Sequence, residues 1–235
     1  MDQTIVRPPN RFLQALGSSD FNLLSSHLRT VTLRQDTTLF APGRPIDRLY
    51  FPHTALISMV ISLECGGSVE TGMVGRDSVA GAPAAFDLPL SFSGAVVQIG
   101  GEASVVDVAT IQTAVKSSDS LRSALYRHDQ LLLAQAQQSV GCASKHQVGE
   151  RLSRWLLHIR DLVHSDTIAL TQESLAQMMG VRRTSVTLVA HSLQNAGLIK
   201  YRRGKIRIVD LEGLQQASCE CHAAVQSHEA NIFGH

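Results

Sequence analysis

The stretch TQESLAQMMGVRRTSVTLVAHSLQNAGLIKYRRGKIRIVD, residues 171–210, decides the fold of the C-terminal part of this chain. Thr171 precedes a helical pattern and is a residue type that caps free backbone amides at a helix start. Glu173 follows where the positive end of the helix dipole stabilises a carboxylate. Gly180 suits the positive φ of a tight turn. The stretch therefore predicts two helices joined by a short turn.

The spacing of small and apolar residues in this stretch indicates a helix-turn-helix. A small residue, Ala176, lets the second helix cross closely over the first, and apolar residues form the wedge between the two helices. The apolar residues are Leu175, Met179, Val181, Val186 and Val189. The alternative is an ordinary helical hairpin inside a core, which would not require all these residue types together.

The outward face of the second predicted helix is cationic at its start. Arg182 and Arg183 fall in the first turn, where the positive helix dipole disfavours them in isolation. An anionic partner would relieve this conflict, and Arg183 is placed to donate two hydrogen bonds to a guanine edge in a major groove. The alternative is that each arginine is an ordinary solvated surface charge. The residues of this segment predicted to contact DNA are Thr171, Gln172, Arg182, Arg183, Thr184, Ser185 and Thr187.

The following residues, 195–209, predict a helix end and a β-hairpin. Gly197 suits a helix C-terminus, and apolar and cationic residues alternate on both sides of a turn near Gly204. The cations at the tip of this hairpin are Arg202, Arg203 and Lys205. Such side chains bind backbone phosphates. With the two helices, the hairpin predicts a winged helix-turn-helix.

Charge is unevenly distributed along the chain. The 235 residues include 21 Lys and Arg against 20 Asp and Glu, which excludes a globally basic, histone-like protein. Residues 150–212 alone hold ten basic and six acidic side chains. The predicted winged domain is therefore basic while the rest is slightly acidic, which favours a nucleic acid as its partner.

The residue pattern of the rest of the chain changes twice. The first 30 residues predict one or two short amphipathic helices, and short β-branched segments with glycine turns follow up to about residue 110. We therefore predict an α+β fold in three parts. They are an N-terminal antiparallel β-roll sensor domain at 1–117, a dimerisation helix at 118–146, and a winged helix-turn-helix DNA-binding domain with a C-terminal tail at 147–235.

Residues 118–163 contain no proline and predict two long helices. In the first, an alternating four-and-three spacing predicts a coiled-coil seam between two chains. The alternative is a long helix that lies on its own roll. The predicted seam residues are Leu121, Leu125, His128, Leu132, Gln135, Ser139 and Cys142. In the second helix, an apolar stripe includes Trp155, which is expected in the core.

Two segments carry a resemblance to a known family. LTQESLAQMMGVRRTSVTLVAHSLQNAGLIKYRRGKIRIVDLEGL (residues 170–214) resembles the C-terminal DNA-binding domain of the Crp-Fnr superfamily of bacterial transcription regulators, and ERLSRWLLHIRD (residues 150–161) is similar to the helix that leads into it. The match extends less sharply over the whole chain. The resemblance implies a homodimer that binds double-stranded DNA at a two-fold-symmetric operator, with RNA polymerase as a further candidate partner.

Within the recognition helix, the resemblance is partial. The guanine-contacting arginine of the family falls on Arg183. The next base-reading position, often glutamate in the family, is Thr184, and a later arginine position is Leu188. These differences leave DNA binding as the expectation but change the operator sequence that is expected.

The sensor half departs further from nucleotide-binding members of the family. Their phosphate cassette contains a Gly-Glu turn and an arginine that pairs with the cyclic phosphate. In residues 72–103, which correspond to the cassette, Arg76 is the only cation, and it precedes the expected place. A cyclic phosphate would lack its charge-assisted partner. We therefore predict weak or no cyclic-AMP binding, in a roll that is ligand-free or binds a different ligand.

The cysteines are far apart in the sequence, at Cys65, Cys142, Cys219 and Cys221. Iron–sulfur members of the superfamily group cysteines near the N-terminus, so a cluster is not expected. The C-terminal pair, with His222, His228 and His235 nearby, has one intervening residue, whereas structural zinc sites usually have two to four. We expect incidental thiols on a helical tail, with no metal and no cofactor. Cys142 and His146 lie one helical turn apart. They are either a pair at the seam that responds to oxidation, or Cys142 is simply a small buried thiol.

Enzyme function is not expected. Metal-dependent oxygenases on β-roll folds need several histidines and a carboxylate inside the barrel, but residues 31–110 contain only His53. The predicted function is a homodimeric, sequence-specific transcription regulator. The alternative is a regulatory module of the same fold that no longer binds DNA. No apolar run approaches the length of a membrane span and the N-terminus lacks an export signal, so a cytoplasmic protein without a membrane partner is expected.

Overall fold

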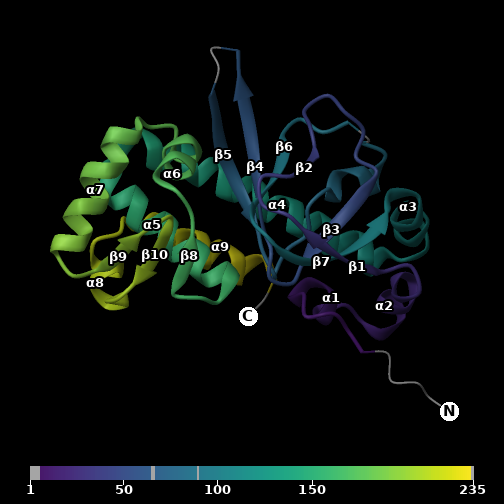
Figure 1. Cartoon of the computed structure of the whole chain (residues 1–235). Coiled ribbons are helices and arrows are strands. Elements are labelled where there is room, and N and C mark those ends of the chain that lie inside the picture. Colours follow the sequence, from purple (N-terminus) through teal and green to yellow (C-terminus); the bar gives the residue numbers. More distant parts are fainter. Residues whose placement is uncertain (1–5, 65–66, 89, 234–235) are drawn as a thin grey trace. The chain divides into compact units, whose positions relative to one another are not determined.

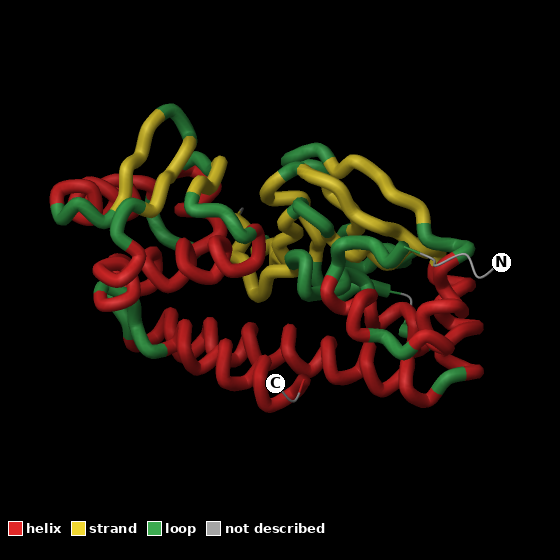
Figure 2. The backbone as a smooth tube through the Cα atoms, turned by 90° about the horizontal axis from the view of Figure 1, so that it is seen from below, coloured by secondary structure: helices red, strands yellow, loops and turns green. Residues whose placement is uncertain are grey.

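The computed structural model describes residues 6–64, 67–88 and 90–233. It forms two compact units. The first, which we call the roll unit, comprises Met1–Met59 and Met73–Gln130; the second, the winged-helix unit, comprises Val60–Gly72 and Leu131–His235. Helix α4 (Asp119–Lys145) is shared between them rather than forming a part of its own, and Figure 2 shows it as one uninterrupted helix.

The roll unit is built from short antiparallel strands and small helices, which confirms the predicted fold class (Figure 1). One sheet has the order β1-β7-β3 and a second has the order β2-β6-β4-β5. The strands are β1 (Arg29–Leu33), β2 (Thr38–Phe40), β3 (Arg48–Pro52), β4 (Leu56–Leu63), β5 (Gly67–Val74), β6 (Gly94–Ile99) and β7 (Gly101–Asp107). The helices are α1 (Arg11–Ala15), α2 (Ser18–Ser25), the 3₁₀ helix η1 (Ala82–Phe86) and α3 (Val108–Ser117).

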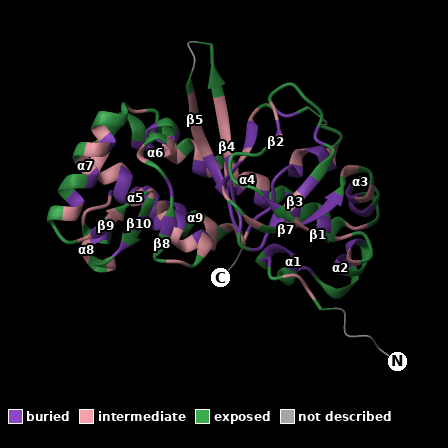
Figure 3. Ribbon diagram, viewed as in Figure 1, coloured by how far each residue is buried: buried purple, intermediate pink, exposed green. Residues whose placement is uncertain are grey.

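The core of the roll unit follows from strand alternation. On β3, Leu49 and Phe51 are fully buried, and both pack in one cluster with Val106 of β7 and Ile111 of α3. Figure 3 shows buried residues along β3 and β7. Buried Asn10 attaches the N-terminal helices to this core: its side chain caps α1 and donates hydrogen bonds to the Pro52 and Ser78 carbonyls, at 2.9 and 3.0 Å.

The winged-helix unit contains the C-terminal helices and a three-stranded sheet of order β8-β10-β9. Helix α5 begins with a capping box in which Gln147 and Glu150 satisfy each other's backbone amides. Its apolar stripe, including Trp155, is buried as predicted. The elements are α5 (Val148–Val163), β8 (Thr167–Ala169), α6 (Gln172–Met179), α7 (Arg183–Asn195), β9 (Ile199–Arg202), β10 (Lys205–Ile208), α8 (Leu211–Gln216) and α9 (Cys221–Phe233).

Candidate nucleic-acid interface

Helices α6 and α7 form the helix-turn-helix that the sequence predicts. Thr171 caps α6, because its hydroxyl accepts the Ser174 amide at 3.1 Å. The helix ends at Gly180, whose φ of 62° is the positive value expected for the turn. Ala176 is 3% exposed and Val186 is fully buried, so the close crossing and the wedge are both present. These local features hold α7 in a defined orientation on α6.

The start of α7 presents its polar residues outward. Arg182, Arg183 and Thr184 are exposed, and Ser185 is half-buried. Arg182 is the N-cap, but its side chain makes no capping hydrogen bond. Backbone amides at such an end and the positive helix dipole favour a negative group nearby. Further along, Leu188 is 73% exposed at the family's later arginine position, so this surface is partly apolar.

Arg183 and Glu173 form a loose ion pair across the two helices. The Arg183 Nε lies 3.7 Å from Glu173 Oε2, and the two side chains are 66% and 70% exposed. An exposed ion pair of this kind contributes little to stability. It keeps the guanidinium at the surface of the helix-turn-helix, where a stronger anion can replace the carboxylate.

Thr187 and Gln172 connect the two helices rather than projecting freely. The Thr187 hydroxyl donates to Gln172 Oε1 at 2.8 Å and also lies 3.0 Å from the Arg183 carbonyl. The sequence indicated both residues as DNA contacts but not this bond between them. The structure therefore gives the pair a positioning role for α7, and their contact with DNA stays a prediction.

The wing is the hairpin of β9 and β10, paired with Lys205 opposite Arg202. Its two-residue turn consists of Arg203 and Gly204, with φ of 50° and 73°. Two successive positive φ values are the type I′ geometry of tight hairpins. All three predicted tip cations, Arg202, Arg203 and Lys205, are exposed.

Arg203 occupies a backbone conformation that asparagine adopts more easily. We expect Arg203→Asn to raise the free energy of unfolding by up to about 1 kcal/mol. The same change should weaken binding to all DNA sequences and lower the salt dependence by about one phosphate contact. Thermal unfolding and a salt titration of DNA binding measure the two effects. Arg202→Asn is the matched control without the gain in stability, and a loss of affinity confined to some sequences would contradict the phosphate role.

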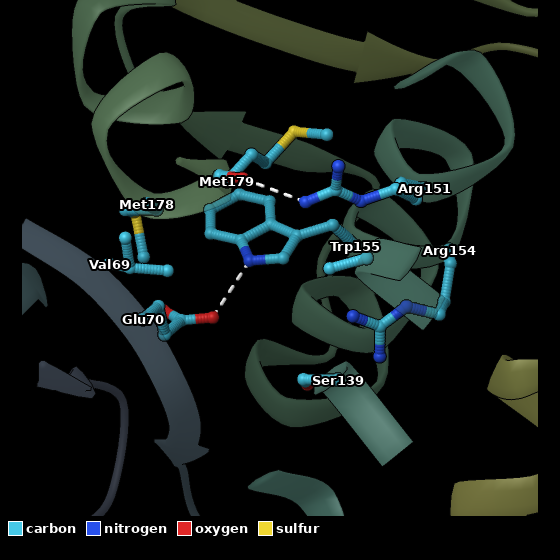
Figure 4. A pocket seen from close by; sticks show the side chains of 9 residues that line it. Val69, Glu70, Ser139, Arg151, Arg154, Trp155, Met178 and Met179 are labelled. Atoms are coloured by element: carbon cyan, nitrogen blue, oxygen red, sulfur yellow. Dashed lines mark hydrogen bonds between the residues drawn. The ribbon is translucent and has the colours of Figure 1, made fainter. Parts of the chain in front are cut away.

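A segment distant in sequence packs on the helix-turn-helix within the winged-helix unit. Trp155 Nε1 donates to Glu70 Oε1 at 2.8 Å, and Gln177 Nε2 donates to Ser68 Oγ at 2.7 Å. Figure 4 shows Glu70 and Val69 of β5 beside Trp155, with Arg151 donating to the Met179 carbonyl at the end of α6. Sequence reasoning missed these β5 contacts, since nothing in residues 67–72 alone indicates a partner about 85 residues away.

The predicted dimer seam is wrong in its N-terminal part, because those side chains are used inside the chain. Leu121 and Leu125 are fully buried in the core cluster of the roll unit. His128 is also fully buried, with its Nε2 3.1 Å from the Val79 carbonyl and its ring edge-on to Phe12. None of the three is available to a second chain.

Of the other predicted seam residues, Gln135 and Cys142 are buried within the winged-helix unit, whereas Leu132 and Ser139 are half-buried. Leu132 and Gln135 lie against Gly72 of β5. Ser139 lines the small cavity beside Trp155 (Figure 4), and Cys142 is fully buried. The physical reason is that the four-and-three spacing identifies an apolar stripe but not what covers it. The buried residues of the predicted seam fit the alternative, a helix that lies on its own chain, and pairing through Leu132 and Ser139 stays a prediction.

Buried His128 predicts an acid-sensitive fold. Burial lowers its pKa from 6.5 to about 4, against the opposing charge of Asp77. Between these values the unfolded chain binds more protons, so stability is lost as the pH falls from 6.5 towards 4. At pH 5 we expect His128 to cost about 2 kcal/mol of unfolding free energy.

The measurement is urea unfolding at pH 7 and pH 5. His128→Leu should reduce the difference between the two pH values, whereas the exposed His27→Gln should leave it unchanged. Half-buried His158 also has a lowered pKa and contributes a pH dependence that is common to all three proteins. An undiminished pH dependence in His128→Leu would contradict the assignment.

The sensor residues considered in the sequence lie in the roll unit. Arg76 is half-buried; its carbonyl accepts the Arg11 amide at 2.6 Å, and its Nε has no hydrogen-bond partner within residues 6–64, 67–88 and 90–233. His53 is 7% exposed and lies 2.9 Å from the Ser104 hydroxyl, and burial lowers its pKa. His53 is thus a hydrogen-bonded core residue, and weak or absent cyclic-AMP binding stays a prediction.

Three of the cysteines come together although the sequence separates them. Cys142, Cys219 and Cys221 form one buried cluster, and burial raises the pKa of Cys142 and raises that of Cys219 to about 12. His146 joins them. His222, which follows Cys221 directly in the sequence, is not part of this group, because its Nε2 lies 2.9 Å from Asp161 Oδ2 on α5. His228 is exposed, and Cys65 and His235 lie outside the described residues.

Comparisons with known proteins agree with this geometry. Residues 150–217 match the model of the Crp-like helix-turn-helix domain. Among solved structures, FixK2 from Bradyrhizobium japonicum has a TM-score of 0.69 at 14% identity, covering 82% of this chain and 98% of that one. A CRP/FNR-family regulator from Thermus thermophilus has a TM-score of 0.66 at 22% identity, covering 81% and 98%.

The c-di-GMP-responsive regulator CLP from Xanthomonas campestris has a TM-score of 0.66 at 17% identity, covering 82% of this chain and 99% of that one. A comparison with curated protein sequences finds no match. The likeness to these structures shows a common fold, a β-roll followed by a winged helix-turn-helix. Residues 150–217 of this chain thus carry a Crp-like helix-turn-helix domain. In the part of the chain that the structure describes, no helix is both long and apolar enough to cross a membrane.

Proposed function

We propose that this chain is a sequence-specific transcription regulator that binds double-stranded DNA as a homodimer, under control of the roll unit. The observation that carries the proposal is the exposed Arg183 at the start of α7, on a helix-turn-helix with the expected turn and wedge. A helix presented in this way fits a major groove, and its first residues reach base edges.

Base reading is assigned to the start of α7. Arg183 is the residue that would donate to guanine O6 and N7, and Thr184 is the neighbouring candidate for a base or phosphate contact. The uncapped amides of α7 supply donors for a phosphate at the same end. Phosphate contacts of the wing then set the register of the domain on the duplex, without reading sequence themselves.

The homodimer is assigned to the opposite face of α4 from the predicted seam. Tyr126, Leu133 and Val140 are 58%, 49% and 71% exposed, and they recur every seven residues along the helix. At about 100° per residue they form one stripe, about a quarter of a turn away from Leu125 and nearly half a turn away from Gln135. A heptad stripe of large apolar residues in water favours pairing with a second copy.

Control of DNA binding is assigned to the elements that both units share. Helix α4 and strand β5 contain residues of each unit, and β5 contacts α5 and α6 through Glu70 and Ser68. A change in the roll would alter the pairing of two α4 helices and these contacts. The separation of the two recognition helices would follow, and it must match successive major grooves, about 34 Å apart.

The test is selection of binding sites from random-sequence duplexes with the full chain. We expect recovered sites with two-fold symmetry and half-sites one helical turn apart. Affinity should fall steeply with salt because wing cations displace counterions. Recovery of no preferred sequence, with no salt-dependent binding, would overturn the proposal and favour a regulatory module that no longer binds DNA.

A further inference from the structure

Four potential metal ligands converge at the end of α4. Cys142 lies in the last turn of α4 and His146 directly follows that helix. Cys219 lies just before α9, and Cys221 is the first residue of α9. The sulfur and nitrogen atoms that they offer all lie within 4.8 Å of one another. The three cysteines are 0%, 6% and 2% exposed, while the His146 side chain is 19% exposed.

Two of the distances within this group match those of a tetrahedral zinc site. Zinc–sulfur bonds of about 2.3 Å and zinc–nitrogen bonds of about 2.0 Å place two sulfurs about 3.8 Å apart, and a sulfur and a nitrogen about 3.6 Å apart. The Cys142 and Cys219 sulfurs are 3.6 Å apart, and Cys221 Sγ is 3.6 Å from His146 Nδ1. A disulfide would require sulfurs about 2.05 Å apart.

The groups around the four ligands also suit a metal. His146 Nε2 lies 3.2 Å from Glu220 Oε2, which holds the proton on Nε2 and turns the Nδ1 lone pair towards the sulfurs. Carboxylates commonly orient metal-binding histidines in this way. Gln138 Nε2 donates to Cys221 Sγ at 3.0 Å, as it would to a thiolate.

The charge balance is consistent with a divalent cation. Three thiolates and a neutral imidazole around Zn²⁺ leave one net negative charge. Arg154 acts electrostatically on Cys142 from the adjacent helix α5, and its Nε has no hydrogen-bond partner among the described residues. Its positive charge would stabilise the filled site.

We propose a structural zinc site whose four ligands are Cys142, His146, Cys219 and Cys221. Three Cys and one His are a donor set of structural zinc sites, and four protein ligands leave no position for a substrate. The ion would join the last turn of α4 to the start of α9. Since His146 directly precedes the N-cap of α5, the ion would also hold the junction between α4 and α5.

The experiment starts from full-length reduced protein stripped of metal and titrated with Co²⁺ and then Zn²⁺. We expect one ion per chain, with the visible bands of tetrahedral Co²⁺ and the thiolate charge-transfer absorption, both displaced by Zn²⁺. Zinc should protect three of the four cysteines from alkylation. Absence of stoichiometric binding, or a Cys142–Cys219 disulfide under reducing conditions, would overturn the site.

Matched variants separate ligands from neighbours. His146→Gln and Cys221→Ser should weaken Zn²⁺ binding by at least 100-fold, and Glu220→Gln by about 10- to 100-fold. His222→Gln changes the adjacent histidine that pairs with Asp161 and should bind Zn²⁺ like the original chain. If His222→Gln lost the ion as His146→Gln does, the assignment would be wrong.

A further readout does not depend on variants that fold poorly. Adding Zn²⁺ to the stripped original chain should raise its melting temperature and slow amide exchange around residues 142–150 and 216–225. No change in exchange at these two segments would overturn the structural role. DNA affinity is not needed for any of these measurements, so they stand apart from the proposed function.

Discussion

Arg183→Ala should weaken binding to the selected operator by about 1–3 kcal/mol and relax the base preference at one position in each half-site. The reason is that Arg183 is exposed at the start of α7, where a bidentate contact to guanine is geometrically possible. Competition binding against operators with each base at that position measures both effects. The lost affinity should be largest for the preferred base.

The control for this variant is Arg44→Ala, which removes an exposed arginine from the roll unit. It should change neither affinity nor base preference. An equal loss for every base would make Arg183 a phosphate contact, and an unchanged affinity would contradict the placement of α7 in the groove. Because both positions are exposed, neither change should alter the free energy of unfolding by more than about 0.5 kcal/mol.

Leu133→Lys combined with Val140→Lys should convert the dimer into folded monomers. Both side chains are exposed on one stripe of α4, so charge there costs little within a single chain but repels a second copy across the seam. Sedimentation equilibrium measures the association, and far-UV circular dichroism shows whether the fold is kept. A dimer that persists would contradict this stripe as the interface.

Leu125→Ala is the matched change at a buried position of α4. Leu125 is fully buried in the roll core, so its truncation should lower the unfolding free energy by about 2–5 kcal/mol. The folded fraction should still dimerise, because the exposed stripe is intact. Dissociation of a folded Leu125→Ala protein would instead support a dimer interface along the seam predicted from the sequence. The affinity of the Leu133→Lys, Val140→Lys protein for DNA should be lower than that of the original chain, since a monomer contacts only one half-site.

The sequence predicted features whose partners are close along the chain. The Thr171 cap, the turn at Gly180 and the hairpin at Gly204 each depend on backbone conformation within a few residues, and residue type restricts that conformation strongly. The outward placement of Arg183 follows from the helix period once the inward residues are known. The strand character of the roll was also evident from its alternation and glycine turns.

The sequence alone thus determined the winged helix-turn-helix and the class of fold, through local conformational preferences and periodicity. Tertiary structure decided which face of α4 is covered by its own chain and which lies in solvent. That helix carries two apolar stripes, and periodicity alone does not distinguish the one that is covered from the one that is exposed. It also decided that Cys142 meets Cys219, 77 residues later. Such a meeting depends on the packing of whole elements against one another, which no short stretch of residues encodes.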